Sequence, residues 1–350
     1  MNHEFYMRRC IELAKNGLGL TYPNPMVGAV IVADGKIIGE GWHRKAGGPH
    51  AEVLAIASVK DPGLLCRSTL YVSLEPCSHF GKTPPCCDLV LESGIPSVVV
   101  GTVDPNEKVA GRGIAKLRDA GVDVTVDVLA PDCRELNKRF FTFHNKRRPY
   151  VILKWAQSAD GFITPLTKNA RGPVWISGSY SQQLVHKWRA EEQAILVGTR
   201  TAIDDNPKLD VRHWTGENPV RIVIDKSARI PLQSHIFDNQ TPTIVVTSPG
   251  RTGAFGDLPT LTVDFNTAVA AQILTKLYGY GLQSVIVEGG ALTLQTFIDA
   301  GLWDEARVFI GKTVLTQGVQ APLINGPATR QTMHDDELLI FRNHDQHHYF

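Results

Sequence analysis

The chain has 350 residues, of which 43% are hydrophobic and 20% charged, and its formal net charge is +1. This length is enough for two globular domains, and the balanced charge lacks the basic field that long nucleic acids require. Six cysteines in so long a chain do not indicate a disulfide framework. Because there is no apolar signal core and no run of about 18 apolar residues, we expect a soluble, cytoplasmic protein with no membrane and no nucleic-acid partner.

From the N-terminus onward, the apolar pattern predicts helices that alternate with strands, including an early hairpin with Asp34-Gly35 as its turn signal. The predicted helices of this first half cover residues 4–16, 50–59, 85–93, 110–120 and 131–146. Its predicted strands cover residues 27–32, 36–42, 68–74, 97–101 and 122–126. This order indicates a three-layer α/β domain with a mixed sheet. Pro149 marks its expected boundary, giving domains of residues 1–148 and 149–350.

Two short stretches of the first half carry the residue types of a catalytic metal site. His50 and Glu52 lie two apart at the start of a predicted helix, so one can bind a metal while the other reaches past it. Cys77 and Cys86 flank a loop with glycine and prolines that can turn both sulfurs toward one point. One imidazole, two thiolates, a position for water and a separate carboxylate make up a catalytic zinc site. The order H-x-E followed by P-C…C is the zinc deaminase signature, in which zinc lowers the pKa of its water to about 7.

Other interpretations of these residues stay open at this point. A lone histidine is more often an ordinary core or surface residue, and cysteines of an intracellular chain are more often buried thiols. A closed structural zinc would need a fourth ligand, which only Cys87 or His79 readily supplies. Because Cys86 and Cys87 are adjacent, the spacing alone does not decide which of them binds metal.

The second half predicts another α/β pattern, without an internal repeat. Its predicted strands cover residues 150–155, 194–197, 220–224, 243–247, 261–263, 284–287 and 307–310, and its predicted helices cover 179–192, 267–278 and 292–300. Residues 198–207 are predicted to be a polar loop. Gly289-Gly290 lies between a strand and a helix, where a phosphate can approach backbone N–H groups, although such a pair is often only a tight turn. No G-x-G-x-x-G follows the first strand, which disfavours an ordinary Rossmann domain.

Taken together, these motifs resemble the bifunctional deaminase–reductase family of riboflavin biosynthesis. The similarity extends over residues 3 to about 325. In the first half the matching segments are Pro-Asn-Pro-x-Val-Gly at 23–28, His-Ala-Glu at 50–52 and Glu-Pro-Cys-Ser-His-Phe-Gly-Lys-Thr-Pro-Pro-Cys at 75–86. In the second half they are Lys154 through Asp160-Gly161, Trp175-Ile176-Ser177, Asp204-Asp205-Asn206-Pro207 with Leu209 and Arg212, and Val287-Glu288-Gly289-Gly290.

The resemblance implies a cytidine-deaminase-like three-layer α/β/α domain followed by a dihydrofolate-reductase-like α/β domain. The first would release the amino group of 2,5-diamino-6-ribosylamino-4(3H)-pyrimidinone 5′-phosphate with one zinc per chain. The second would use NADPH to reduce the ribosyl group of the product to ribityl. By analogy we expect a homo-oligomer. The alternative is a deaminase for another nucleotide or a nucleic-acid base, followed by a binding domain that does not reduce.

Matching motifs also imply residue roles, with His50, Cys77 and Cys86 as zinc ligands and Glu52 as the proton carrier. The residues implied to contact the deaminase substrate are Asn24, His43, Lys82 and Asn106. Those implied to hold the ribosyl substrate of the reductase are Arg189, Leu209, Arg212 and Glu288. Those implied to hold NADPH are Trp175, Thr201, Asp205, Gly290, Ala291, Leu292, Thr293, Leu294, Gln295 and Thr296.

Two features depart from the family pattern. Pro173 stands where many relatives have a serine, which removes one hydroxyl group from the expected reductase substrate site. The tail after Ala328, which contains His344, His347 and His348, matches no motif with a known role.

Overall fold

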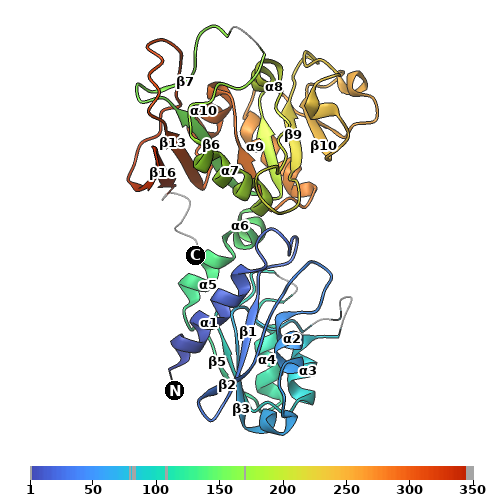
Figure 1. Ribbon diagram of the computed structural model, residues 1–350. Coiled ribbons are helices and arrows are strands. Elements are labelled where there is room, and N and C mark those ends of the chain that lie inside the picture. The colour runs from blue at the N-terminus through green and yellow to red at the C-terminus, as the bar shows by residue number, and fades with distance from the viewer. Residues whose placement is uncertain (1, 79, 81–83, 107–108, 169–170, 344–350) are drawn as a thin grey trace. The chain divides into compact units, whose positions relative to one another are not determined.

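The computed structural model describes residues 2–78, 80, 84–106, 109–168 and 171–343. The chain forms two compact units (Figure 1). The first ends at Lys146 and the second begins at Arg147. Among the described residues, no helix combines the length and the apolar character needed to cross a membrane.

The first unit is built on a five-stranded sheet with the order β2-β1-β3-β4-β5. β1 runs antiparallel to both β2 and β3, whereas β3, β4 and β5 are parallel, so the sheet is mixed. The strands are β1 (Gly28–Ala33), β2 (Lys36–Trp42), β3 (Ser68–Val72), β4 (Ser97–Val100) and β5 (Asp123–Thr125). The helices are α1 (His3–Lys15), α2 (Ala51–Ala57), α3 (Cys86–Glu92), α4 (Arg112–Asp119), α5 (Ala130–Leu136) and α6 (Lys138–Lys146), with a 3-10 turn at Pro62–Arg67.

Helices cover both faces of this sheet, which explains why every residue of β1 is buried. Ala29 and Ile31 pack with α2, α3 and α4, while Val30 and Val32 pack with α1 and α5 on the opposite face (Figure 1). Successive side chains of a strand point to opposite faces, so a strand between two helical layers is apolar throughout. The predicted three-layer α/β domain with a mixed sheet is confirmed.

The helix predicted over residues 131–146 is wrong in one respect, because the chain breaks it at Asn137 into α5 and α6. The Asn137 side chain is buried and makes two long-range hydrogen bonds. Its Oδ1 accepts the Met26 N–H at 2.8 Å, and its Nδ2 donates to the Met26 carbonyl at 2.8 Å. Asparagine readily replaces helical backbone bonds with bonds from its own side chain, and this partner lies 111 residues away.

Replacing Asn137 with alanine should therefore destabilise the first unit. The change leaves a buried backbone N–H and a buried carbonyl of Met26 without partners, at a cost of about 2–4 kcal/mol in the free energy of unfolding. Asn145→Ala, at an exposed position of α6, is the matched control and should change that energy by less than about 0.5 kcal/mol. Urea unfolding of the full chain measures both, and equal losses would show that the two bonds contribute nothing specific.

The second unit is built on a nine-stranded sheet with the order β11-β10-β9-β8-β12-β6-β13-β16-β15. Strand pairs from β11 to β13 are parallel, and β16 is antiparallel to β13 and β15. The strands are β6 (Tyr150–Gln157), β8 (Ala194–Val197), β9 (Val220–Ile224), β10 (Thr243–Thr247), β11 (Thr260–Thr262), β12 (Ser284–Val287), β13 (Glu305–Ile310), β15 (Ala328–Met333) and β16 (Asp336–Arg342). A small separate sheet pairs β7 (Phe162–Thr164) with β14 (Val319–Gln320).

Helices also cover both faces of the large sheet. The helices are α7 (Ser179–Glu191), α8 (Thr199–Asp205), α9 (Val269–Gly279) and α10 (Ala291–Asp299), with 3-10 turns at His235–Phe237 and Thr252–Phe255. α7 and α8 contribute to the core on one face, and α9 and α10 to the core on the other. Because the parallel strands run in one direction, their carboxyl ends lie at the same edge of the sheet. α8 follows β8 and α10 follows β12 at that edge.

One segment of this unit differs from the prediction, and another had no predicted structure. The predicted loop at 198–207 contains α8, a helix of seven residues in which only Ala202 is buried, so it shows no apolar periodicity. In addition, β15 and β16, a region with no element predicted from the sequence, form a hairpin in which β16 also pairs with β13. Asp336, at the start of β16, accepts hydrogen bonds from the Gly178 N–H at 2.8 Å and the Ser181 hydroxyl at 2.5 Å. The hairpin thus caps the N-terminus of α7.

Candidate active sites

Three potential metal ligands of the first unit converge from three separate elements. His50 directly precedes α2, Cys77 follows β3, and Cys86 is the first residue of α3. Their ligand atoms all lie within 4.8 Å of one another. His50 Nδ1 lies 3.2 Å from the Cys86 sulfur and 3.6 Å from the Cys77 sulfur. The fold therefore brings together residues that are up to 36 positions apart.

The spacing and the chemistry of this donor set fit zinc. Zinc–sulfur bonds of about 2.3 Å and zinc–nitrogen bonds of about 2.1 Å separate nitrogen from sulfur by about 3.6 Å in a tetrahedral site. The Cys77 sulfur also accepts the Cys86 backbone N–H at 3.3 Å. Hydrogen bonding from the Cys86 thiol, with a further contribution from His50, lowers the pKa of Cys77. A thiolate is the form in which cysteine binds a metal.

Cys87 points to a different part of the structure than Cys86. Its buried thiol donates to the Pro76 carbonyl at 3.4 Å and to the Gly113 carbonyl at 3.5 Å. Burial raises the pKa of the Cys87 thiol to about 12. The geometry favours Cys86 over Cys87 as the third ligand, a choice that the spacing left open. His79, the other possible fourth ligand, lies outside the described residues.

Glu52 and two of the residues expected to contact substrate lie around this cluster. Glu52 is 3% exposed in the first turn of α2, and burial raises the pKa of its carboxyl group. The His43 ring meets the His50 ring edge to face, with 5.5 Å between centroids. His43 Nδ1 lies 3.0 Å from the Pro49 carbonyl, which can only accept, so Nδ1 is the donor. His43 Nε2 is then left to accept a hydrogen bond from the Asn24 amide nitrogen at 3.1 Å.

Burial lowers the pKa of His43, which favours the neutral ring that this arrangement requires. Asn106 lies in the segment after β4, and its backbone N–H donates to Asp104 Oδ1 at 2.7 Å. Lys82, the fourth residue expected to contact substrate, lies outside the described residues.

In the second unit, Glu288 is the centre of a buried ionic cluster at the end of β12. One of its oxygens lies 2.8 Å from Lys154 Nζ, and the other lies 2.7 Å from an Arg189 terminal nitrogen. Burial opposes ionisation, but Arg189 and Lys154 outweigh it and hold the pKa of Glu288 at about 2. Arg189 also donates to the Asp210 carbonyl at 3.2 Å, so its guanidinium is already engaged by protein groups.

Leu209 and Arg212 belong to the segment that Arg189 contacts. Leu209 is buried, with a φ of +54°, and the Arg212 guanidinium forms an ion pair with the Asp210 carboxylate. The Arg212 N–H donates to His186 Nδ1 at 3.1 Å. Four residues expected to hold the ribosyl substrate are thus joined through direct contacts and the short segment 209–212.

Sequence reasoning assigned no role to Lys154 or His186, although both contact this group. Lys154 is the only charged residue in the otherwise apolar start of β6, which is a usable signal. His186 lies one helical turn before Arg189 on α7.

The expected cofactor residues meet where α8 and α10 begin. A Cβ on Gly289 would lie 2.9 Å from Thr201 Cγ2, and a Cβ on Gly198 would lie 2.4 Å from Thr293 Oγ1, so only glycine permits this approach. Gly290 has a φ of +79° and precedes the first turn of α10. The expected residues from Ala291 to Thr296 all lie in this helix.

The remaining expected cofactor residues have varied surroundings. The Asp205 carboxylate forms an ion pair with Lys168, whose Nζ also donates to the Gly172 carbonyl at 3.1 Å. The Trp175 side chain is 60% exposed, whereas Leu294 is completely buried in the core. The burial of Leu294 covers its backbone as well as its side chain, and its N–H donates to the Gly290 carbonyl at 3.0 Å.

Unfolding at acid pH should reveal the contribution of the Glu288 charge. Its pKa is about 2 in the folded chain against an ordinary value of 4.5, so the charge stabilises the fold above pH 4.5 and this contribution is lost as the pH falls toward 2. The shift corresponds to roughly 3 kcal/mol. In urea unfolding at a series of pH values, the wild type should lose stability more steeply in this window than Glu288→Gln. Parallel curves would contradict the prediction.

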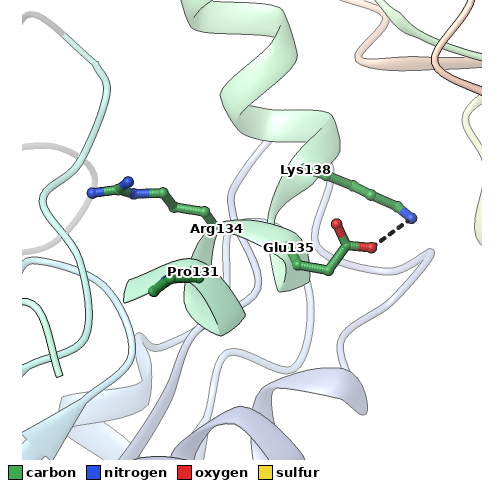
Figure 2. A pocket seen from close by; sticks show the side chains of 4 residues that line it. All are labelled: Pro131, Arg134, Glu135 and Lys138. Atoms are coloured by element: carbon green, nitrogen blue, oxygen red, sulfur yellow. Dashed lines mark hydrogen bonds and ion pairs between the residues drawn. The ribbon is translucent and has the colours of Figure 1, made fainter. Parts of the chain in front are cut away.

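A small surface hollow occurs where α5 meets α6, with a volume of about 110 Å³. Figure 2 shows Arg134 and Lys138 extending to either side of it, with Lys138 paired to Glu135 at 3.0 Å. The hollow shares no residue with either candidate site, and its ion pair links the end of α5 to the start of α6. We assign it no function.

Both halves of the chain match models of known protein families. The model of the cytidine and deoxycytidylate deaminase zinc-binding region matches residues 1–102, and that of the RibD C-terminal domain matches residues 149–344. The riboflavin biosynthesis protein RibD of Aquifex aeolicus is 43% identical over 321 residues, covering 90% of this chain and 88% of that protein. RibD of Escherichia coli is 35% identical over 345 residues, covering 90% and 89%.

Solved structures agree with this result. The chain is similar to a diaminohydroxyphosphoribosylaminopyrimidine deaminase/5-amino-6-(5-phosphoribosylamino)uracil reductase from Thermotoga maritima, with a TM-score of 0.86 and 37% identity over 97% of this chain and 98% of that one. RibD from Acinetobacter baumannii gives a TM-score of 0.85 at 33% identity, with the same coverage. The chain therefore belongs to the RibD family of riboflavin biosynthesis, bifunctional enzymes in which a zinc-binding deaminase domain precedes a reductase domain.

Proposed function

We propose that the first domain releases the amino group of 2,5-diamino-6-ribosylamino-4(3H)-pyrimidinone 5′-phosphate, and that the second reduces the ribosyl group of the product to ribityl with NADPH. One observation carries the first half of this proposal: His50, Cys77 and Cys86 present one nitrogen and two sulfurs within 4.8 Å, beside the buried carboxylate of Glu52. Three protein ligands and a separate acid–base group are the composition of a catalytic zinc site.

In the deaminase domain, His50, Cys77 and Cys86 would hold one zinc per chain. When bound, the metal supplies a water that is acidic enough to act as a nucleophile near neutral pH. Glu52, two residues from His50, would carry a proton to the substrate ring and to the departing amino group. His43 occupies the Asn24 amide nitrogen, which leaves the Asn24 oxygen to accept a hydrogen bond from a donor on the pyrimidine. Lys82 and Asn106 would complete the substrate contacts.

In the reductase domain, the Gly289-Gly290 turn and the start of α10 would receive the cofactor phosphates, because backbone N–H groups and the helix dipole favour an anion there. Trp175, Thr201 and Asp205 would hold other parts of NADPH, which supplies the hydride when bound. Lys154 and Arg189 keep Glu288 ionised and in place, so that its carboxylate would orient the ribosyl substrate. The half-exposed Arg212 guanidinium would exchange Asp210 for the substrate phosphate.

An assay that follows both reactions separately tests this proposal. Purified protein given the diaminopyrimidine ribosyl phosphate should release ammonia and then oxidise NADPH, and NADPH oxidation should also proceed directly from the deaminated intermediate. Ammonia release without NADPH oxidation would contradict the reductase assignment, with Pro173 as the first residue to change. Ammonia release from another nucleotide or from single-stranded DNA, with none from this substrate, would favour the alternative deaminase.

We further propose that the protein is a cytoplasmic homo-oligomer that binds no nucleic acid, with its domain boundary between residues 148 and 149. The near-neutral net charge supports the absence of nucleic-acid binding. Analogy alone supports the homo-oligomer. Sedimentation equilibrium of the purified chain tests the assembly, and a monomer at micromolar concentration would contradict it.

A further inference from the structure

We infer that Glu75 is a positioning residue of the deaminase site, which holds Asp104 and the stretch Gly111–Ile114 close to the residues around Cys77. Its carboxylate is 4% exposed and accepts four backbone hydrogen bonds. One oxygen accepts the N–H groups of Gly113 at 2.9 Å and Ile114 at 3.3 Å. The other accepts those of Gly111 at 2.9 Å and Asp104 at 3.2 Å.

This set of donors requires a carboxylate. An ionised carboxylate is acceptor-only on both oxygens, whereas a glutamine would turn an NH₂ group toward two of the four N–H donors. Burying a charge is costly unless hydrogen bonds compensate it, and here the donors include the start of α4, where the helix dipole also favours a negative charge. Glu75 therefore fixes the entry of the chain into α4.

The backbone at the start of α4 also lies close to the residue before Cys77. A Cβ on Gly113 would lie 2.1 Å from the Pro76 carbonyl oxygen, so only glycine allows the backbone of α4 to lie so close to the residue before Cys77. The Cys87 thiol bridges the two segments by donating to the carbonyls of Pro76 and Gly113.

A second link leads from Glu75 toward the substrate. Asp104, whose N–H is held by Glu75, accepts the Asn106 backbone N–H through its own Oδ1 at 2.7 Å. The chain of contacts from Glu75 through Asp104 to Asn106 thus sets the backbone of a residue expected to contact the pyrimidine substrate. This inference rests on the proposed deaminase function. The metal ligands keep their own contacts, so Glu75 should affect substrate binding more than zinc binding.

Glu75→Gln in the full chain tests this role, with Glu92→Gln at an exposed position of α3 as the matched control. We expect Glu75→Gln to raise the KM for the diaminopyrimidine ribosyl phosphate about tenfold or more, which corresponds to the loss of one charge-assisted hydrogen bond. The kcat for ammonia release and the zinc content should stay within about twofold of wild type. Glu92→Gln should change none of these quantities. NADPH oxidation from the deaminated intermediate should be unchanged in both, which shows that the second unit is folded.

Asp104→Ala removes only the second link and should also raise KM. The double variant should then be no worse than the more severe single variant, because both act through one chain of contacts. An unchanged KM in Glu75→Gln, additive effects in the double variant, or loss of zinc together with activity would each overturn the inference. Failure of the proposed function would be seen separately, as a wild-type protein that releases no ammonia.

Discussion

Replacing Cys86 with serine should abolish zinc binding and ammonia release, whereas the same change at the adjacent Cys87 should leave both nearly intact. The Cys86 sulfur lies 3.2 Å from His50 Nδ1 within the ligand cluster, while the Cys87 thiol donates to the carbonyls of Pro76 and Gly113. Without the metal, the attacking water is no longer acidified from a pKa of 15.7 to about 7, so we expect deaminase turnover to fall by at least about a thousandfold.

Cys87→Ser keeps a hydroxyl donor at a buried position, so its zinc content and turnover should remain within about twofold of wild type. Atomic absorption on purified protein and ammonia release measure the two quantities. The reductase reaction from the deaminated intermediate is the internal control, because its residues lie in the other unit. If Cys87→Ser lost zinc and Cys86→Ser kept it, the order of the two cysteines in the site would have to be reversed.

Glu52→Gln should produce a folded, zinc-containing protein whose ammonia release is slower by about 10²–10⁴-fold, the usual contribution of a general acid–base group. Glutamine preserves the size and burial of the side chain, which is 3% exposed, but it cannot take up and return a proton. The zinc ligands are other residues, so zinc content should equal that of the wild type.

The two reactions of the chain separate this effect from general damage. NADPH oxidation that starts from the diaminopyrimidine should fall by the same factor as ammonia release, because the reductase then lacks its substrate. Supplying the deaminated intermediate should restore it fully. A Glu52→Gln protein that still releases ammonia at the wild-type rate would exclude Glu52 as the proton carrier.

Local patterns in the sequence determined much of the fold. Apolar periodicity predicted the mixed sheet of the first unit and most parallel strands of the second, because each strand lies between two helical layers and is apolar over its length. Periodicity did not predict α8 or β15, which bury few side chains. It also missed β16, although Leu338 and Phe341 of that strand are core residues. Elements with little burial leave almost no hydrophobic pattern to read.

For the candidate sites too, the sequence predicted some features and left others to the tertiary structure. The order of His50, Glu52, Cys77 and Cys86 indicated a zinc deaminase from the sequence alone, since the chemistry demands those residue types. The spacing did not separate Cys86 from Cys87, and the family resemblance implied Cys86. The tertiary structure supplies the physical reason, which is where each side chain points at the start of α3.

Long-range contacts account for the features of the fold and the sites that the sequence did not predict. The four bonds to Glu75 come from donors 29 to 39 residues away, and Lys154 meets Glu288 across 134 residues. The helix break at Asn137 depends on Met26, 111 residues earlier. A sequence pattern records the local period of burial, whereas these contacts arise only when distant segments pack together, and they determine which polar groups hold the sites in place.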